Sequence, residues 1–386
     1  MKLKRLFTIT LAVLMLLPCL TLLNSAADES LLPEEDVYAK GGYVLTKKTT
    51  KNSDGEFEST NYSYNDQHLL EKSVSNYKYD NGRDGQITQT YAYDAQGRII
   101  KEEYVHVLSS GRFGKVVEQF FFDKDGKLLK KTFLSKDRYG TVRKETTANI
   151  YDAAGVLTKT TKTMKSNDGE TRKTVILYDS KGNALKETNA YADSDGKKTK
   201  EVIVTVYEKN GNAVKKNTRF VAADGSVSPT FAVFSYDEKG NLTKEAYTYI
   251  DRDGAASKDV TSCAYDSSSR KIKEVRINTT QDGFCSKIRK TFNYDKNGNV
   301  IKEVTTVKST EGVNEKTVTA HTFDKKGNLT KTVSVYKDNT DRFVRRETTA
   351  QVYDSHDNLI KKAFVNKNSD GYAFKSVDTY EYQKLG

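Results

Sequence analysis

Lysine is the most regularly placed side chain in this sequence that could bind a ligand. An ammonium group can hold an anion, or its aliphatic stem can cover an aromatic ring. Along the chain, a lysine recurs eight residues after an aromatic residue that opens a short motif. Two hypotheses stay open: the lysines shield rings within a thin sheet, or cations and rings together bind an extended polyanion or glycan. The series is Lys72, Lys101, Lys130, Lys159, Lys186, Lys215, Lys244, Lys273, Lys302, Lys331 and Lys361.

Catalytic chemistry finds little support in the sequence. The four histidines stand singly, without the spacing of metal ligands or a neighbouring cysteine, at His68, His106, His321 and His356. No phosphate-binding loop, dinucleotide fingerprint or nucleophile elbow is present. Carboxylates such as Asp123 and Asp125 lack the spacing of a calcium loop and are expected to cap turns. We therefore predict a non-catalytic protein without metal or cofactor.

The aromatic motif repeats about every 29 residues and predicts the elements that position the lysines. Copies such as YDEKGNLTKE and YDKNGNVIKE place Asp, two permissive residues and Gly between two strands, which is typical of a hairpin closed by a left-handed glycine. The opening aromatics are Tyr64, Tyr93, Phe122, Tyr151, Tyr178, Tyr207, Tyr236, Tyr265, Tyr294, Phe323, Tyr353 and Tyr382. His68, Ser269 and Asp357 replace the glycine, and those turns should be strained or different.

A second turn signal, often Asp-Gly, falls halfway along most units and divides each unit into two strands. The predicted fold is therefore all-β, a repetitive antiparallel meander of roughly two dozen strands. We expect an elongated, twisted open sheet, with coiling into a spiral or a partial barrel as the alternative. Pro229 should mark a bulge or bend in its strand.

Pairing across the first turn predicts one shared aromatic and lysine face. In this register the opening aromatic pairs with the residue six places later, and the residue two before it faces the lysine. The candidate ligand-binding face is Tyr91, Tyr93, Lys101, Phe120, Phe122, Lys130, Phe234, Tyr236, Lys244, Phe292, Tyr294 and Lys302. The same register places Cys263 and Cys285 on opposite faces, about 23 Å apart along the strands, so no disulfide is expected.

The N-terminus predicts export. Residues 1–27 combine a basic start, an apolar run and a small-residue site, as a secretory signal peptide does. Residues 28–42 are acidic and predict a flexible leader, and residues 43–386 hold the repeats. The formal net charge of +11 is spread along the chain rather than clustered, so we expect no nucleic-acid partner, and no membrane span remains after signal cleavage.

The motif resembles the YD-repeat, or RHS-repeat, family, whose signature is Tyr-Asp, Gly after two more residues, then Arg or Asn and Leu. The resemblance covers nearly all of residues 43–386. It implies an exported bacterial surface or wall-associated protein built of extended β-sheet, sometimes wrapped as a shell around a toxin. This chain has a longer unit and ends within a repeat, so toxin cargo is not expected.

Three functions remain to be compared. The first hypothesis is an exported structural or adhesive scaffold, extracellular or bound to the cell envelope, whose partner is cell-wall or extracellular polysaccharide, a polyanion or a protein. The second is an outer-membrane β-barrel, which exported ten-residue strands also fit. Polar residues on both predicted faces count against it. A shell component of a toxin or secretion system is the third.

Overall fold

The computed structural model describes residues 42–78, 84–111, 113–340 and 342–385, and every regular element in them is a β-strand. The predicted signal peptide and nearly all of the predicted leader lie outside the described residues. The strands are β1 (Tyr43–Asn52), β2 (Phe57–Tyr64), β3 (Leu70–Lys78), β4 (Asp84–Tyr93), β5 (Ile99–Leu108), β6 (Phe113–Phe122), β7 (Leu128–Lys136), β8 (Val142–Tyr151), β9 (Leu157–Ser166), β10 (Thr171–Tyr178), β11 (Ala184–Ala192), β12 (Lys198–Tyr207), β13 (Ala213–Val221), β14 (Val227–Tyr236), β15 (Leu242–Ile250), β16 (Ala256–Tyr265), β17 (Lys271–Thr279), β18 (Cys285–Tyr294), β19 (Val300–Ser309), β20 (Asn314–Phe323), β21 (Leu329–Lys337), β22 (Phe343–Tyr353), β23 (Leu359–Asn368) and β24 (Ala373–Lys384).

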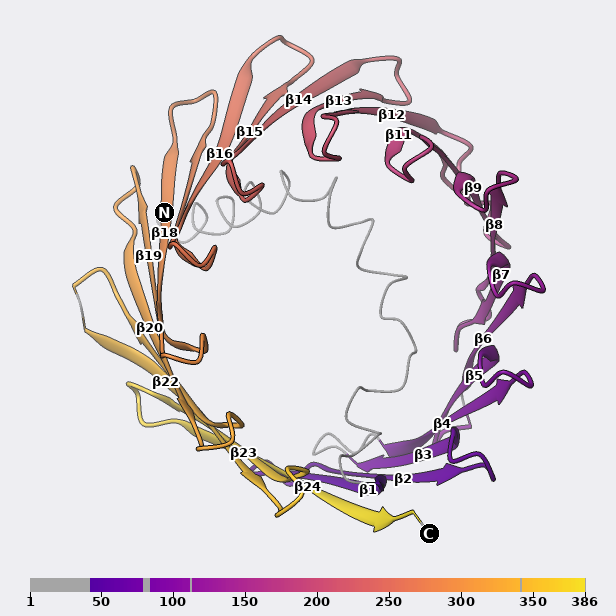
Figure 1. The fold of residues 1–386 in the computed structure, drawn as a ribbon, viewed down its shortest axis with the longest axis vertical. Helices are drawn as coiled ribbons and strands as arrows, with labels where there is room; N and C mark the ends of the chain where they lie inside the picture. Colours follow the sequence, from indigo (N-terminus) through magenta and orange to yellow (C-terminus); the bar gives the residue numbers. More distant parts are fainter. Residues whose placement is uncertain (1–41, 79–83, 112, 341, 386) are drawn as a thin grey trace. The chain divides into compact units, whose positions relative to one another are not determined.

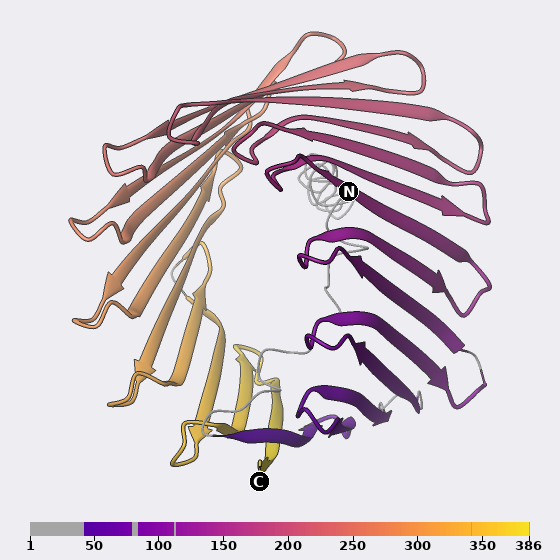
Figure 2. The ribbon, with the colours of Figure 1, turned by 45° about the vertical axis from the view of Figure 1, so that its right-hand side comes forward.

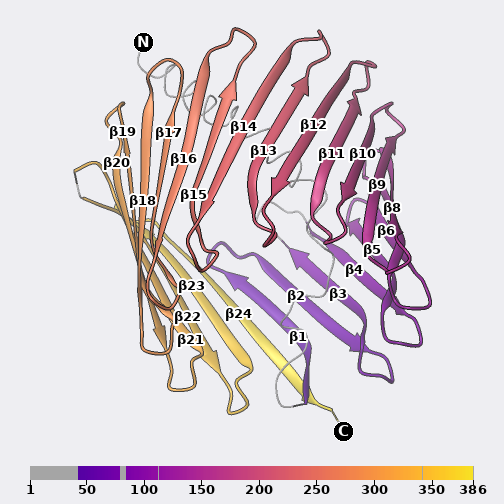
Figure 3. The same ribbon diagram turned by 45° about the horizontal axis from the view of Figure 1, so that its top comes forward.

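The strands form one antiparallel meander that closes on itself. Each strand pairs with the next along the chain, and β1 pairs with both β2 and β24. Figures 1 and 2 show the indigo β1 beside the yellow β24, which completes the ring. The predicted meander of about two dozen strands is confirmed. The sheet is closed rather than open, and its strands run at a slant around the ring (Figure 3).

The first turns, which follow the aromatic motif, have the predicted geometry. In a representative turn, Oδ1 of Asp237 accepts the backbone N–H groups of Lys239 and Asn241. The amide of Asn241 donates to Oδ2 of the same aspartate. Gly240 supplies the left-handed backbone with φ of 82°. The aspartates therefore cap turns, as the sequence indicates.

The three turns without glycine keep this geometry. The residues in the glycine position have φ of 60°, 61° and 66°, at His68, Ser269 and Asp357 respectively. Left-handed backbone is unfavourable for a residue with a Cβ atom. These turns are therefore strained rather than different.

A β-bulge before every opening aromatic changes the predicted register. Tyr93 pairs with Ile99 as expected, but Ala92, not Tyr91, pairs with Lys101. The extra residue, Ile100, shifts the remaining pairs by one, so Tyr91 faces Glu102. Because side chains alternate along a strand, this shift moves every motif lysine to the opposite face of the sheet. No register shift accompanies Pro229, so of the predicted bulge or bend the bulge is wrong.

The two faces of the ring differ in burial. One face carries the buried strand residues Thr60, Ser73, Ser75, Tyr77, Tyr91, Glu102, Glu118, Thr160, Met164, Thr174, Ala232, Asp259 and Tyr380. The other carries exposed apolar residues at regularly paired positions, among them Val107, Phe121, Leu134, Ile150, Val204, Phe231, Val233 and Val352. Side chains converge on the concave side of a closed sheet and diverge on the convex side, so the buried face points inward. We call the two the inward and the outward face.

Candidate functional site

The inward face is a polar network. Thr174 donates to Asn189, whose amide donates to Glu187 and Glu201, joining β10, β11 and β12. The guanidinium of Arg276 binds the buried carboxylate of Asp259 through two nitrogens. Polar groups removed from bulk water need such partners, and these have them. The network gives the ring a hydrophilic interior.

Tyrosine hydroxyls fasten neighbouring hairpins along the inward face. The hydroxyl of Tyr236 donates to the carbonyl of Ala213 at 2.9 Å, and that of Tyr265 donates to the carbonyl of Leu242 at 3.0 Å. Tyr178 bonds to the hydroxyl of Thr160 instead. The carbonyl bond recurs at Tyr64, Tyr93, Tyr151, Tyr207, Tyr294, Tyr353 and Tyr382. The repeated tyrosine is therefore a structural tie between hairpins.

Charge is divided between the two faces. Strand carboxylates that point inward are Glu58, Glu102, Glu118, Glu145, Glu187, Glu201, Glu245, Asp259, Glu274, Glu303, Glu315, Glu347 and Asp378. Within the described strands, Glu103, Glu381 and the strand-end Asp84 are the outward carboxylates at regularly paired positions. The motif lysines all point outward, between Val, Thr, Ala, Leu and Phe side chains. The inward face also holds cations, such as Lys162 and Lys216, whereas the outward face is strongly basic.

The structure separates the residues of the predicted aromatic and lysine face. Its rings point inward, at Tyr91, Tyr93, Phe120, Phe122, Phe234, Tyr236, Phe292 and Tyr294. Its lysines point outward, at Lys101, Lys130, Lys244 and Lys302. The continuous face predicted from the sequence is therefore wrong. A cation still lies over a neighbouring ring in places, since Lys130 is 5.5 Å from the ring centre of Phe121 and Lys131 is 5.1 Å from that of Phe120.

The described cysteines lie on opposite faces, and two histidines bond to strand hydroxyls. Cys263 points inward and Cys285 points outward, on opposite faces as predicted, and both are free. His106 bonds to the hydroxyl of Tyr77 and His321 to that of Thr332. Among the described residues, no group of three or more His, Cys, Asp or Glu side chains could hold a metal ion.

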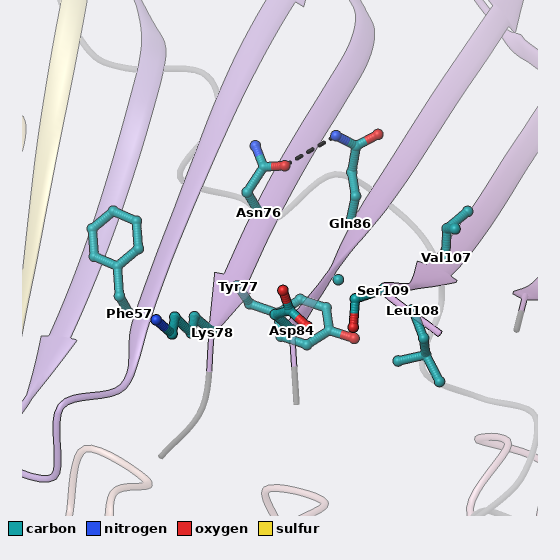
Figure 4. Close-up of a pocket in the computed structure, with 10 residues that line it drawn as sticks. Phe57, Asn76, Tyr77, Lys78, Asp84, Gln86, Val107, Leu108 and Ser109 are labelled. Carbon is teal, nitrogen blue, oxygen red and sulfur yellow. Dashed lines mark hydrogen bonds between the residues drawn. The ribbon is translucent and has the colours of Figure 1, made fainter. Parts of the chain in front are cut away.

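A shallow depression of about 520 Å³ lies where β2 and β4 begin and β3 and β5 end (Figure 4). Asn76 accepts a hydrogen bond from Gln86 on its wall. A Cβ atom at Gly85 would lie 2.6 Å from the carbonyl oxygen of Val107 and 2.5 Å from the hydroxyl of Tyr77. Glycine is therefore needed for close packing, and the depression has no constellation suited to catalysis.

One sequence feature indicates which residues face inward, although the predicted pairing across the first turn did not use it. A glutamate directly follows the motif lysine at Glu102, Glu187, Glu245, Glu274 and Glu303. Alternation along a strand places it opposite the lysine, and the structure confirms this. The bulge could not be read from the motif, so the aromatic was assigned to the lysine's face instead of the glutamate's.

The sequence matches no protein-family model and no curated protein. Among solved structures, it is similar to a porin-like protein from Bacteroides uniformis at 10% identity, covering 90% of this chain and 100% of that one with a TM-score of 0.25. It is also similar to the P pilus usher (PapC) translocation pore at 8% identity, covering 89% and 99% with a TM-score of 0.35. Because these TM-scores are low, the functional argument below rests on the geometry of the closed sheet and not on these similarities. No helix among the described residues is long and apolar enough to span a membrane.

These findings overturn the first functional hypothesis. The adhesive, glycan-binding scaffold required an elongated sheet with rings and lysines on one face. The sheet is closed, and the bulge places rings inside and lysines outside. Polar residues on both predicted faces counted against a barrel. In the structure, the interior is polar and the exterior is partly apolar. The hypothesis of an outer-membrane β-barrel fits the structure better.

Proposed function

We propose that this protein forms a water-filled pore in a membrane of the cell envelope, after export by its predicted signal peptide. One observation carries the proposal: all strands close into a ring whose polar network faces inward and whose exposed apolar strand residues face outward. Apolar-out and polar-in alternation on a closed sheet is the pattern of membrane-spanning barrels. Closure leaves no unpaired sheet edge in the bilayer.

The width of the ring supports passage of solutes. Barrels of about 16 to 18 strands already leave an aqueous channel that side chains do not fill, and this ring has 24 strands. Its inward carboxylates, ammonium groups and hydroxyls suit hydrophilic solutes. We assign no catalytic step to it, and any relation to YD-repeat proteins would lie in the hairpin unit rather than in wall binding.

The outward apolar band is short, which restricts the membrane it fits. On β19, Val304 and Thr306 lie between Lys302 and Lys308, and β21 repeats this arrangement. Six residues span about 20 Å along a strand, and less along the axis of a tilted barrel. Lysine stems can extend toward both interfaces. We therefore expect insertion to be most efficient into bilayers with short acyl chains.

Reconstitution into planar bilayers and vesicles tests the pore. We expect stepwise conductance and release of small hydrophilic dyes. The native Cys263, left alone by Cys285→Ser, should react with a charged thiol reagent that enters the lumen. Val233→Cys in a Cys263→Ser/Cys285→Ser background is the outward control, and a polarity-sensitive dye on it should report lipid. No insertion into any vesicle, or an aqueous signal at residue 233, would contradict the proposal.

A further inference from the structure

Like charges stand directly opposite one another on the outward face near the second turns, those halfway along each unit. Lys144 pairs with Lys165 across β8 and β9, and Lys287 pairs with Lys308 across β18 and β19. Three more such pairs are Lys115 with Lys136, Lys316 with Lys337 and Arg346 with Lys367. Directly opposed like charges on neighbouring strands destabilise a sheet.

The described part of the chain neutralises the cations of these pairs unevenly. Glu103 binds Lys115 at 2.7 Å. Lys144, Lys165, Lys287 and Lys308 form no ion pair within the described part of the chain, where nearly all strand carboxylates point inward. An external anion that bridges two ammonium groups would relieve the repulsion.

These pairs belong to a wider ring of cations. Lys173, Lys200 and Lys258 point outward from the same part of their own strands, and the motif lysines form a second ring nearer the first turns. On six strands a lysine of one ring stands six residues from a lysine of the other, on β3, β7, β9, β19, β21 and β23. The two cationic rings flank a band of mostly Val, Thr and Ala, interrupted by Arg289 on β18, as two layers of anionic groups flank an apolar layer.

We propose that the two outward rings bind the phosphates of anionic lipid headgroups at the two surfaces of the bilayer, with the opposed pairs near the second turns as the main sites. This inference rests on the proposed pore and names the lipid that the pore requires. Each phosphate accepts hydrogen bonds from both ammonium groups of an opposed pair, such as Lys144 and Lys165. Anionic lipid near basic side chains strengthens membrane attachment in proportion to their number.

Flotation with vesicles of phosphatidylcholine alone, or mixed with phosphatidylglycerol, tests the inference on the full chain. We expect the wild type to prefer the mixed vesicles at low salt and to lose much of that preference as salt rises. Lys144→Gln/Lys165→Gln/Lys287→Gln/Lys308→Gln should lower partition into mixed vesicles by roughly tenfold or more. The matched control removes four inward charges by Lys162→Gln/Lys216→Gln/Lys290→Gln/Lys362→Gln and should keep the preference.

The outcomes separate this inference from the pore. Equal insertion into both vesicle types at every salt concentration overturns the lipid preference and leaves the pore standing. Equal losses in both quadruple variants also overturn it, because net charge would then explain the effect. Failure to insert into either vesicle overturns the pore and the inference together. Circular dichroism confirms that each variant keeps its β-structure.

Discussion

Single side chains decide how the hairpins join. The motif tyrosine places its half-buried ring on the inward face, and in most repeats its hydroxyl donates to a carbonyl of the preceding hairpin. One residue therefore supplies both packing and register. Phe122 and Phe323 provide only the ring. The recurrence of tyrosine, which the sequence shows, could be predicted to matter, whereas the acceptor carbonyl could not, because it lies 23 residues earlier in the chain.

Tyr236→Phe removes one such tie. The carbonyl of Ala213 loses its donor, and we expect the free energy of unfolding to fall by about 1 kcal/mol. Urea unfolding of the detergent-solubilised barrel measures the change. Phe323→Tyr is the reciprocal variant. It would add a hydroxyl that can donate to the carbonyl of Val300, and it should raise stability by a similar or smaller amount. Unchanged stability in Tyr236→Phe would show that the tie is only geometric.

Ser269→Gly relieves strain in a first turn. Ser269 has φ of 61°, a conformation that glycine adopts without the Cβ penalty. We expect a gain of up to about 1 kcal/mol. Gly240→Ala is the reverse change at φ of 82° and should cost a similar amount or somewhat more. Urea midpoints of the two variants should move in opposite directions, and movement in the same direction would count against the strain.

In the hairpins, the local sequence pattern predicts the turns but not the bulges. The Asp-x-x-Gly motif predicted the first turns correctly, including the left-handed residue, because turn conformation depends on a few adjacent residues. The turn motif does not show that a residue beside the opening aromatic, such as Ile100, is left without a direct partner. One extra residue, Ile100 in the β4–β5 hairpin, places Lys101 on the face opposite Tyr91 and leaves the predicted meander order unchanged.

Acid should loosen the first turns. Hydrogen bonds from the side chains of Asn183, Asn241 and Asn299 hold the pKa values of Asp179, Asp237 and Asp295 below their ordinary value. A lowered pKa in the folded state contributes stability that is present above the unfolded value, near 3.9, and is lost as pH falls through the folded value. At a second turn, the backbone N–H of Thr340 helps lower the pKa of Asp338 to about 2.

Hydrogen exchange at the turn amides from neutral pH to about pH 2 measures this loosening. We expect protection near residues 237–241 to fall below about pH 4. Asp237→Asn keeps an acceptor but cannot titrate, so protection at its turn should no longer depend on pH in that range. A pH dependence that persists in this variant would assign the effect to other groups.

Closure belongs to the whole molecule and could not be predicted from the repeat. Identical hairpins fit an open sheet, a spiral or a ring, and the accumulated twist and stagger of all strands decide among them. The seam is ordinary pairing, with Thr49 opposite Thr379 and Lys48 opposite Tyr380. The pairing of β1 with β2 and its pairing with β24 agree on which β1 side chains point inward and which point outward.

A disulfide across the seam tests closure. Thr49→Cys/Thr379→Cys in a Cys263→Ser/Cys285→Ser background should form a crosslink on mild oxidation, because directly paired residues lie within disulfide reach. Gel mobility before and after reduction detects it. Thr49→Cys/Thr348→Cys, with its second cysteine on β22, is the matched pair that should stay reduced. Crosslinking of both pairs, or of neither, would contradict a closed ring.

The matching directions of β1 at both of its neighbours limit how this molecule can change size. A single added strand would reverse the chain direction at the seam and break the antiparallel pairing. A whole unit of two strands preserves it. Duplication or loss of one repeat would therefore widen or narrow the ring by two strands while keeping every face as it is. The bore of the barrel is set in steps by the copy number of a short genetic module.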